Sequence, residues 1–556
     1  MTDNAYAHAV TTLQKFVEDL LPYWPVPGGA IVITDRDGIV ANWGFGIADI
    51  ERNIPSTTDH LYLIGSISKS FTALVINQLV DEGKLNLDDD ITAILPWVQI
   101  GPDSTPTTIH QLLTHTAGLI MGDDGTPDDL VQTWALRNLP VAPDASQHWH
   151  YSNVGFMLLG QVVQEITGNL IADEISTRIL EPLYMPSTRG SIANVDRADY
   201  AVGYWQSDDD LPWRQGSPIS PSYWFEIDAG DGCVGSSSTD MAQYLRLMLS
   251  DGTVDGNQIL KPETFQRFVT GHALDGEPLM EIRGGMKASS SKYGYGVNVE
   301  TVDGYECVTH GGGMVGYATF FIADRTNGIG IAVLTNTNGD FPAAHAIARA
   351  GHQLFVEASG EREYPALPPA SDAVVTHRDS NAPLANMAGT FINELGASMT
   401  VTLNGDTMSV ATGEHNGTLE PTWTGRYVTD LPYFDRFRWD FVDDSWLIGP
   451  HTFAATQPAY PALDEASQAL VGSYRHFTPW YPRLRIFQRG HSLYLACVSG
   501  IEAPQFDELL VRLDDTTWRL GEANWLPERI HLGPIINGQA AFVVRDGVSY
   551  SRTTFK

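Results

Sequence analysis

Three polar motifs, separated by long stretches of chain, constrain the fold of this sequence more than any other feature. Residues 66–69 read Ser-Ile-Ser-Lys, residues 151–153 read Tyr-Ser-Asn, and residues 310–313 read His-Gly-Gly-Gly. Together they offer a hydroxyl nucleophile, an amine and a phenol as proton acceptors, and glycine backbone N–H groups, which are the groups that acyl transfer requires. If they act together, the fold must bring all three segments into one site.

The setting of the first motif predicts a helix N-terminus at Ser66. An apolar extended run at residues 61–65 meets a helical pattern that continues to Val80. Residues i and i+3 share a helix face, so Lys69 is expected beside the Ser66 hydroxyl, where a desolvated amine loses its proton more easily. A second copy of the spacing, Ser289 to Lys292, lies in a Ser-rich run without apolar periodicity. We interpret that copy as an ordinary loop.

The second motif predicts a loop that ends in Tyr151 and a helix that begins at Ser152 or Asn153, because both are good N-cap residues. Taken alone, this is a cap with a packed tyrosine. Beside a Ser–Lys pair, a Tyr151 phenolate could accept the Ser66 proton and return it to the leaving group. The Asn153 amide could hold both the substrate carbonyl and Lys69.

The third motif interrupts a strand pattern. Residues 305–322 alternate like a strand around Gly311, Gly312 and Gly313, and a further strand at 330–336 follows an Asn-Gly turn signal. Glycines in a strand let another backbone or a ligand approach closely. The alternative is a glycine-rich bulge in which His310 is an ordinary edge residue.

Together the motifs resemble the serine β-lactamase and D-alanyl-D-alanine-peptidase superfamily. The sequence is most similar to the class C β-lactamase-like branch with Tyr-x-Asn and His-x-Gly motifs. That branch includes penicillin-binding-protein homologues, D-aminopeptidases, D-amino-acid amidases and family VIII esterases. Flanking stretches agree at residues 112–119, 181–185, 231–241 and 293–296, and the resemblance covers residues 10 to 355.

The resemblance implies a role for each site residue. Ser66 would be the acylated nucleophile, Lys69 its charge partner and a candidate base, and Tyr151 the general base or acid. The substrate-binding residues would be Asn153, Gly312, Gly313 and His310. Asn153 would orient the substrate, and the N–H of Gly312 or Gly313 would form the oxyanion hole together with the Ser66 N–H.

His310 stands where β-lactamases carry lysine, which weakens the case for carboxylate-bearing substrates such as penicillins. Glu226, Asp228 and Asp231 are interpreted as solvated loop carboxylates, with binding of a substrate amine as the alternative.

The expected fold class is an α/β (α+β) β-lactamase/transpeptidase-like catalytic domain, with an antiparallel sheet and a helical region, followed by two small all-β antiparallel barrel domains. We place the catalytic domain at 1–362, a linker at 363–377, and the barrels at 378–460 and 461–556. A weak repeat supports the two barrels, because residues 387–391 and 403–408 parallel residues 471–474 and 488–494. Resemblance to D-aminopeptidases implies the same architecture, in which a tail loop reaches the active site and restricts substrates.

Composition narrows the classes of partner. The net charge of −34 repels phosphate backbones and anionic lipid, so neither nucleic acid nor membrane is expected as a partner. No run of about 18 apolar residues and no signal-peptide pattern occurs, so the expected location is cytoplasmic, or periplasmic after processing.

The three cysteines are far apart and are expected to be buried, and neither a metal nor a cofactor is expected. Oligomeric state stays open, with a homodimer as one option.

The leading functional hypothesis is a serine hydrolase that forms an acyl-enzyme at Ser66 and acts as a peptidase or amidase on small or unusual peptides. These include peptides with a D-residue, non-ribosomal peptides and linearised cyclic peptides. A carboxylesterase or acyltransferase of the same fold is the first alternative, and no Gly-x-Ser-x-Gly elbow occurs to suggest a different esterase fold. A penicillin-binding protein or weak β-lactamase and an inactive binding module are the others.

Overall fold

The computed structural model describes residues 2–103, 105–122, 128–282, 285–338, 343–360, 362–369, 374–375, 384–405, 407–422, 424–497, 499–500 and 506–553. The chain divides into two compact units. The first comprises Met1–Trp205 and Ile219–Val374, and the second comprises Gln206–Pro218 and Val375–Lys556.

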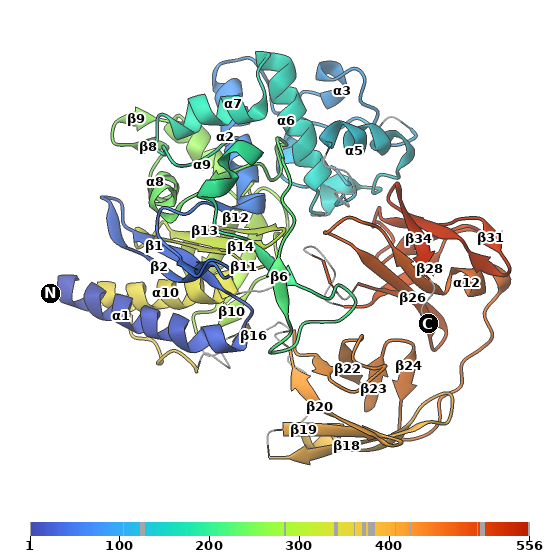
Figure 1. The fold of residues 1–556 in the computed structure, drawn as a ribbon. Coiled ribbons are helices and arrows are strands. Elements are labelled where there is room, and N and C mark those ends of the chain that lie inside the picture. The colour runs from blue at the N-terminus through green and yellow to red at the C-terminus, as the bar shows by residue number, and fades with distance from the viewer. Residues whose placement is uncertain are drawn as a thin grey trace. The chain divides into compact units, whose positions relative to one another are not determined.

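The first unit is built on one eight-stranded antiparallel sheet (Figure 1). Its strand order is β11-β12-β13-β14-β15-β1-β2-β3. The strands are β1 (Gly28–Thr34), β2 (Ile39–Asp49), β3 (Ile54–Pro55), β11 (Ala288–Tyr293), β12 (Asn298–Val302), β13 (Tyr305–Met314), β14 (Tyr317–Asp324) and β15 (Ile329–Thr335). The predicted pairing of the N-terminal strands with the late strands is confirmed, since Ala30 lies opposite Leu334 in the β1–β15 pair.

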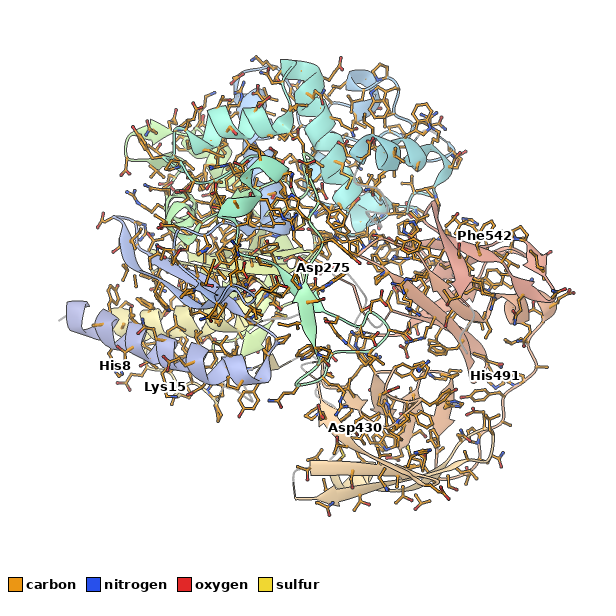
Figure 2. The ribbon with its side chains drawn as sticks, in the orientation of Figure 1. His8, Lys15, Asp275, Asp430, His491 and Phe542 are labelled. Atoms are coloured by element: carbon orange, nitrogen blue, oxygen red, sulfur yellow. The ribbon has the colours of Figure 1, made fainter. Side chains whose placement is uncertain are left out.

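Two helices from opposite ends of this unit's chain cover one face of the sheet. They are α1 (Thr2–Leu20) and α10 (Ala343–Ser359), which lie side by side in Figure 1. The predicted helical spacing of α1 buries one face, with Leu13, Val17 and Leu20 at most 1% exposed. His8 and Lys15 are exposed on α1 (Figure 2). Because both faces of the sheet are covered, every residue of β1, β14 and β15 is buried, and most of them are apolar.

The other face carries α8 (Ser238–Met248) and the helical region. The remaining helices of this region are α2 (Ser68–Asp81), α3 (Ile91–Ile94), α4 (Ile109–Leu113), α5 (Asp129–Ala135), α6 (Asn153–Thr167), α7 (Ile171–Ile175) with η5 (Ser176–Leu180), and α9 (Pro262–Phe268). Among the described residues, no single helix passes the length and hydropathy test for a membrane span. The pair formed by α6 with α7 and η5 passes it jointly, on length and composition only, with a bend of 79° between its two parts.

In its described residues the second unit is all-β apart from two short helices, as predicted. Strands β17 to β24 form an eight-stranded antiparallel sheet in sequence order, and an antiparallel bridge between Ile392 and Ala454 joins its two ends. Strands β25 to β30 with β33 and β34 form a closed barrel. The bounds are β17 (Gly389–Ile392), β18 (Ser398–Asn404), β19 (Thr407–Thr412), β20 (His415–Pro421), β21 (Tyr427–Thr429), β22 (Trp439–Val442), β23 (Ser445–Ile448), β24 (His451–Phe453), β25 (Gly472–Arg475), β26 (Arg483–Arg489), β27 (Ser492–Ala496), β28 (Glu508–Arg512), β29 (Thr517–Leu520), β30 (Arg529–Leu532), β33 (Phe542–Arg545) and β34 (Val548–Thr553).

The sequence repeat coincides with equivalent elements in the two halves of this unit. A short helix precedes the first strand in each half, α11 (Leu384–Met387) before β17 and α12 (Glu465–Leu470) before β25. The next hairpin turns at Gly405 in the first half and at Gly490 in the second, with φ of 63° and 60°. Residues of the predicted linker at 370–373 and 376–377 lie outside the described residues.

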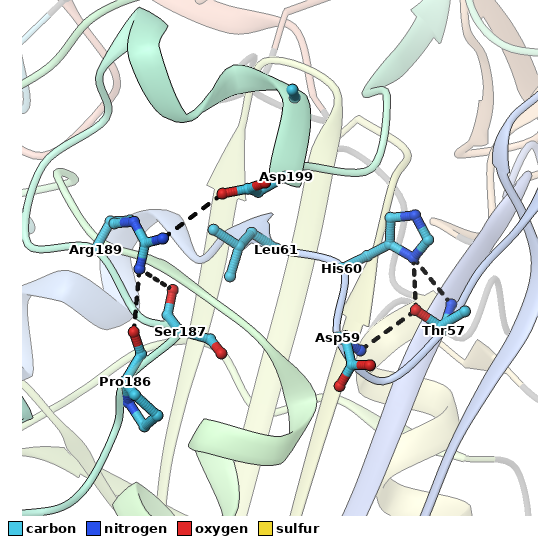
Figure 3. Close-up of a pocket in the computed structure, with 9 residues that line it drawn as sticks. Thr57, Asp59, His60, Leu61, Pro186, Ser187, Arg189 and Asp199 are labelled. Atoms are coloured by element: carbon cyan, nitrogen blue, oxygen red, sulfur yellow. Dashed lines mark hydrogen bonds and ion pairs between the residues drawn. The ribbon is translucent and has the colours of Figure 1, made fainter.

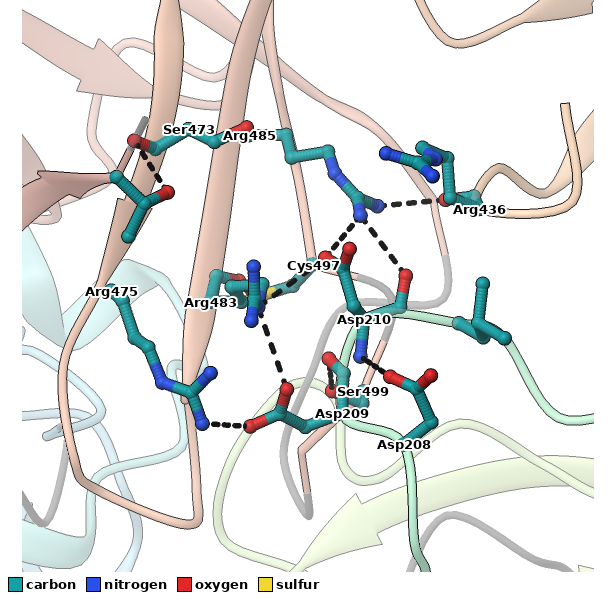
Figure 4. A network of polar contacts seen from close by, with 12 residues as sticks. Asp208, Asp209, Asp210, Arg436, Ser473, Arg475, Arg483, Arg485, Cys497 and Ser499 are labelled. Carbon is teal, nitrogen blue, oxygen red and sulfur yellow. Dashed lines mark hydrogen bonds and ion pairs between the residues drawn. The ribbon is translucent and has the colours of Figure 1, made fainter. Parts of the chain in front are cut away.

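The second unit also contains a loop that the predicted boundaries placed in the catalytic domain. Gln206–Pro218 connects β5 (Tyr204–Gln206) to β6 (Ile219–Pro221), and its acidic residues bind arginines of the barrel (Figure 4). Asp209 pairs with Arg475 at 2.5 Å, and Asp210 pairs with Arg485. The Arg485 side chain is only 6% exposed and also donates to the Arg436 carbonyl at 2.7 Å.

Replacing Asp210 with alanine is expected to destabilise the second unit by about 3–5 kcal/mol, because it leaves a buried arginine without its carboxylate. Chemical denaturation followed by tryptophan fluorescence measures this. The matched control is Asp208→Ala, which removes an exposed carboxylate from the same loop and should cost less than about 1 kcal/mol. Equal losses in the two variants would show that the buried pairing contributes nothing specific.

Candidate active site

The nucleophile motif lies on a tight turn that leads directly into α2. Gly65–Ile67 form the 3-10 turn η2, and the α-helix begins at Ser68. Gly65 has φ of 53°, a conformation that favours glycine. Ser66 is partly exposed between the buried residues Gly65 and Ile67. N–H groups in the first turn of a helix have no helical partner, so this position suits a group that develops negative charge.

Lys69 lies one turn further on, with its amine directed at the nucleophile. Its Nζ is 3.0 Å from Ser66 Oγ, 2.6 Å from Asn153 Oδ1 and 3.0 Å from the Asp231 carbonyl oxygen. The side chain is fully buried. The Asn153 and Asp231 oxygens can only accept hydrogen bonds, whereas the Ser66 hydroxyl can also donate. Ser66 is therefore the neighbour from which a neutral Lys69 could take a proton.

Tyr151 lies beside this pair because its loop is fastened on both sides to one histidine. The Lys69 Nζ is 4.8 Å from the Tyr151 ring centroid. The His150 N–H donates to the His115 carbonyl at 2.8 Å, and the Ser152 N–H donates to His115 Nδ1 at 3.1 Å. The buried His115 ring also packs on the Tyr151 ring at 4.4 Å. Burial, and then the nearby Lys69 charge, lower the pKa of His115 well below its usual value, so it holds the loop as a neutral acceptor.

The helix that carries Asn153 begins as its sequence predicted. Ser152 is the N-cap of α6, and its hydroxyl accepts the Gly155 N–H at 3.1 Å. The same hydroxyl donates to the Ile120 carbonyl at 2.7 Å. These bonds fix the first turn of α6, from which the Asn153 amide reaches Lys69.

The glycine motif of β13 packs against the nucleophile turn. A Cβ on Gly312 would lie 1.9 Å from the Ile64 carbonyl oxygen, so only glycine fits this contact. A Cβ on Gly65 would lie 2.6 Å from the Gly313 oxygen and 2.9 Å from its nitrogen. The Gly313 peptide therefore faces the Ser66 turn, whereas Gly312 is buried and its carbonyl accepts from Thr319 of β14. Of the two predicted oxyanion donors, the geometry favours Gly313.

His310 is fully buried, so the structure does not present its side chain to a substrate. Its Nδ1 is 2.6 Å from the Gly311 carbonyl, which can only accept, so Nδ1 carries the proton. Its Nε2 then accepts from the Tyr293 hydroxyl at 2.8 Å. Burial lowers the pKa of His310 to about 3, so the ring is neutral at pH 7. No cation stands at this position of the strand.

The acidic loop before α8 is only partly solvated, whereas we interpreted all three of its carboxylates as solvated. Asp231 is 9% exposed, and burial raises its pKa against the opposing effect of Lys69. Thr72 and Ser68 of α2 bind the same loop, through the Gly230 carbonyl at 2.7 Å and the Val234 N–H at 3.0 Å. Glu226 and Asp228 are exposed, as expected.

The second Ser-x-x-Lys copy is not in a loop, contrary to our interpretation. Ser289 and Lys292 lie on strand β11 and are both exposed. Residues three apart along an extended strand are separated by about 10 Å, so these two cannot cooperate as Ser66 and Lys69 do.

Sequence patterns missed three further features of this unit. His115 and Tyr293 lie within stretches that carried the family resemblance, but their contacts with Tyr151 and His310 could not be read from the sequence. Glu277, discussed below, follows a turn-like Asp-Gly pair and had no motif to mark it.

One group of side chains has metal-ligand character, although the sequence predicted none. Cys307, Asp324 and His352 place one potential ligand atom each within 4.8 Å of one another, and all three are buried. Asp324 already accepts from His352 at 2.8 Å and from the Asn327 backbone and side chain at 2.9 and 2.7 Å. We interpret the group as a polar cluster that ties α10 to the β14–β15 turn. All three cysteines are buried, as predicted.

A surface pocket of about 330 Å³ lies elsewhere in the first unit (Figure 3). It is lined by Thr57, Asp59, His60, Leu61, Pro186, Ser187, Arg189, Ala198 and Asp199. None of the motif residues contributes to it. Its polar groups bind one another, as in the Arg189–Asp199 ion pair at 3.6 Å, and we assign it no role in acyl transfer.

Two curated bacterial proteins are similar to this chain over about 60% of its length. Protein flp of Staphylococcus aureus (strain N315) is 26% identical over 343 residues, which are 59% of this chain and 63% of that protein. Penicillin-binding protein 4* of Bacillus subtilis (strain 168) is 27% identical over 359 residues, which are 61% of this chain and 74% of that protein. The chain therefore spans less than two thirds of the length of the flp protein.

A solved structure also resembles the fold of this chain. The octameric penicillin-binding protein homologue from Pyrococcus abyssi superposes with a TM-score of 0.56 at 22% identity, over 80% of this chain and 99% of that one. The beta-lactamase family model matches residues 16–354, more than half of the chain and every motif residue described above. The chain belongs to the beta-lactamase family.

Proposed function

We propose that this serine hydrolase of the beta-lactamase and penicillin-binding-protein type is an amidase or peptidase that forms an acyl-enzyme at Ser66. Its substrates would be small peptides with a D-residue, a non-ribosomal linkage or an unusual side chain. The observation that carries the proposal is the buried amine of Lys69, which is within hydrogen-bond distance of both Ser66 Oγ and Asn153 Oδ1, with the Tyr151 ring beside it.

In the proposed reaction, Ser66 Oγ attacks the substrate carbonyl carbon while Lys69 or Tyr151 accepts the hydroxyl proton. The N–H groups of Ser66 and Gly313 stabilise the oxyanion. The C–N or C–O bond then breaks, and Tyr151 returns a proton to the leaving group. A water molecule hydrolyses the acyl-enzyme by the reverse sequence of proton transfers.

Hydrolysis of esters is the second candidate, because the same site would acylate more readily with a better leaving group. A penicillin-directed role has less support. The buried, neutral His310 supplies no cation for a substrate carboxylate.

Mass spectrometry of the intact protein tests these proposals. The protein is incubated with L- and D-aminoacyl amides, p-nitrophenyl esters and a penicillin, and any acylated peptide is then sequenced. We expect a transient adduct on Ser66 with turnover of amides and esters, and no stable penicilloyl adduct. Stable acylation by the penicillin alone would contradict the amidase proposal and favour a penicillin-binding protein. An adduct on any other residue would contradict the assignment of the nucleophile.

A further inference from the structure

An acidic side chain reaches the glycine strand next to the catalytic residues. The carboxylate of Glu277 lies close enough to the Gly311 N–H for this group to favour the charged carboxylate, and Glu277 Oε1 lies 3.8 Å from His310 Nε2. The Asn298 side chain of β12 holds Glu277 in place. Its Nδ2 donates to Glu277 Oε2 at 2.8 Å, and its Oδ1 accepts the Glu277 N–H at 3.0 Å. The Glu277 side chain remains 25% exposed, so a ligand can reach it.

The loop that carries Glu277 is fastened to the sheet. The Tyr293 N–H donates to the carbonyl of Asp275, which is labelled in Figure 2, at 3.0 Å. The Tyr293 carbonyl in turn accepts from the N–H groups of His272 and Ala273 at 2.8 and 3.0 Å. The position of Glu277 is therefore set by Tyr293 of β11 and Asn298 of β12, which lie opposite each other in neighbouring strands.

Glu277 lies on the edge of β13 that a substrate would follow. Strand β12 pairs with β13 only as far as the Asn298–Thr309 pair, and within the part of the chain that the structure describes no strand pairs with this edge beyond Thr309. The influence of the Gly311 N–H on Glu277 indicates that this N–H points to the edge, and alternation places the Gly313 N–H on the same edge about 7 Å further along. Gly311 and Gly313 are both partly exposed. A substrate with its carbonyl oxygen at Gly313 can extend along the edge to Glu277.

The end of the β13 edge at which Glu277 lies is on the side of the site from which the leaving group would depart. Tyr151 is the proposed proton donor to the leaving group, so the leaving group must depart towards it. The Tyr151 ring packs against Tyr293 with centroids 6.5 Å apart, and the Tyr293 hydroxyl binds His310 beside Glu277.

The charges around Glu277 make the site selective. The groups that face it are Lys69 of α2, Tyr293 of β11, Glu300 of β12 and the neutral His310 of β13. Glu300 is paired with Arg349 at 2.6 Å. Burial and then Glu300 raise the pKa of Glu277 to about 7, against the opposing effect of Lys69. The pKa of Tyr293 is raised well above 10 by burial, so its charge does not change near neutral pH.

We propose that Glu277 selects substrates by the charge of the leaving group, accepting a cationic or neutral one and disfavouring one that carries a carboxylate. The proposal rests on acylation at Ser66 and narrows the substrate class. Amino-acid amides, amidated peptides and esters of uncharged or amino alcohols would be preferred over dipeptides with a free C-terminal carboxylate.

Three aryl esters of one acyl group test this, with a meta-carboxylate, a meta-carboxamide or a meta-aminomethyl substituent on the leaving phenol. In the unaltered protein at pH 8, kcat/KM for the carboxylate should be at least about tenfold below that for the carboxamide, as expected for like charges brought close. The substrate carboxylate stays ionised from pH 5.5 to 8.5, so this ratio should widen as Glu277 ionises through pH 7. Glu277→Gln should bring the ratio to within about threefold at every pH.

The matched control is Glu281→Gln, which neutralises a carboxylate four residues away whose side chain is 19% exposed and which binds Lys287. It should leave the ratio and its pH dependence as in the unaltered protein. If the carboxamide ester acylates Ser66 but the ratio is near one, or does not respond to Glu277→Gln, the inference about Glu277 is wrong while the proposed function stands. If none of the three esters acylates Ser66, the proposed function itself fails and takes this inference with it.

Discussion

Replacing Ser66 with alanine is expected to lower kcat/KM for every substrate of this site by about 10⁴-fold or more and to abolish the acyl adduct. The reason is that the reaction passes through a bond to Ser66 Oγ, the hydroxyl oxygen that lies 3.0 Å from Lys69 Nζ. Steady-state rates with an activated ester, together with intact mass, measure the effect. Because Ser66 is partly exposed, the substitution should leave the melting temperature nearly unchanged.

The chain supplies its own control for this experiment. Ser289→Ala removes the other serine that stands three residues before a lysine, but from an exposed position on strand β11. We expect it to keep full activity. A Ser66→Ala protein that still forms an acyl adduct would exclude the acyl-enzyme mechanism proposed for this site.

The sequence predicted those parts of the fold in which local pattern and burial agree. Helix α1, the cap at Ser152 and the pairing of β1 with β15 follow from apolar periodicity, from N-cap chemistry and from apolar strands that need cover on both faces. Ser289 and Lys292 were misplaced because β11 is an edge strand. Its exposed polar side chains give no alternating apolar signal, and pairing with β12 rather than local preference makes it a strand.

The candidate site was predictable only where a residue type by itself implies chemistry. Ser66, Lys69 and Tyr151 stood out because their spacing and flanks had a meaning in acyl transfer. Glu277 did not, because a carboxylate after a turn is usually solvated, and only the fold places it at the Gly311 N–H. The burial of His310 was also hidden, since a histidine in a strand gives no sign of which groups will cover it.

The predicted domain boundaries missed that the loop Gln206–Pro218 belongs to the second unit, because no local sequence pattern marks it. The three aspartates at 208–210 look like a solvated turn, and only the facing arginines of the barrel reveal that the loop belongs to the second unit. Deleting residues 378–556 to test whether the tail restricts substrates would therefore also strip Gln206–Pro218 of its partners. Asp210→Ala tests the role of that connection without removing the tail.

Replacing Lys69 with methionine is the second large expected effect. We expect kcat/KM to fall by about 10²- to 10⁴-fold, the range for loss of a positioned proton-transfer group. Methionine keeps the volume of the buried stem but removes the amine from Ser66 Oγ. Stopped-flow measurement of acylation with an activated ester gives the rate of the step in which Ser66 loses its proton. Lys84→Met, at an exposed lysine paired with Glu82, is the control and should be neutral.

The stability of the same variant separates catalysis from structure. Loss of the amine removes its hydrogen bonds to the Asn153 and Asp231 oxygens, at about 1–3 kcal/mol each, but it also removes the cost of burying a charged amine. The two effects oppose each other, so the free energy of unfolding should change much less than the rate. If Lys69→Met unfolds the protein in proportion to the rate it loses, Lys69 is a structural residue. If it acylates at the normal rate, Tyr151 is the base, and Tyr151→Phe should then abolish acylation.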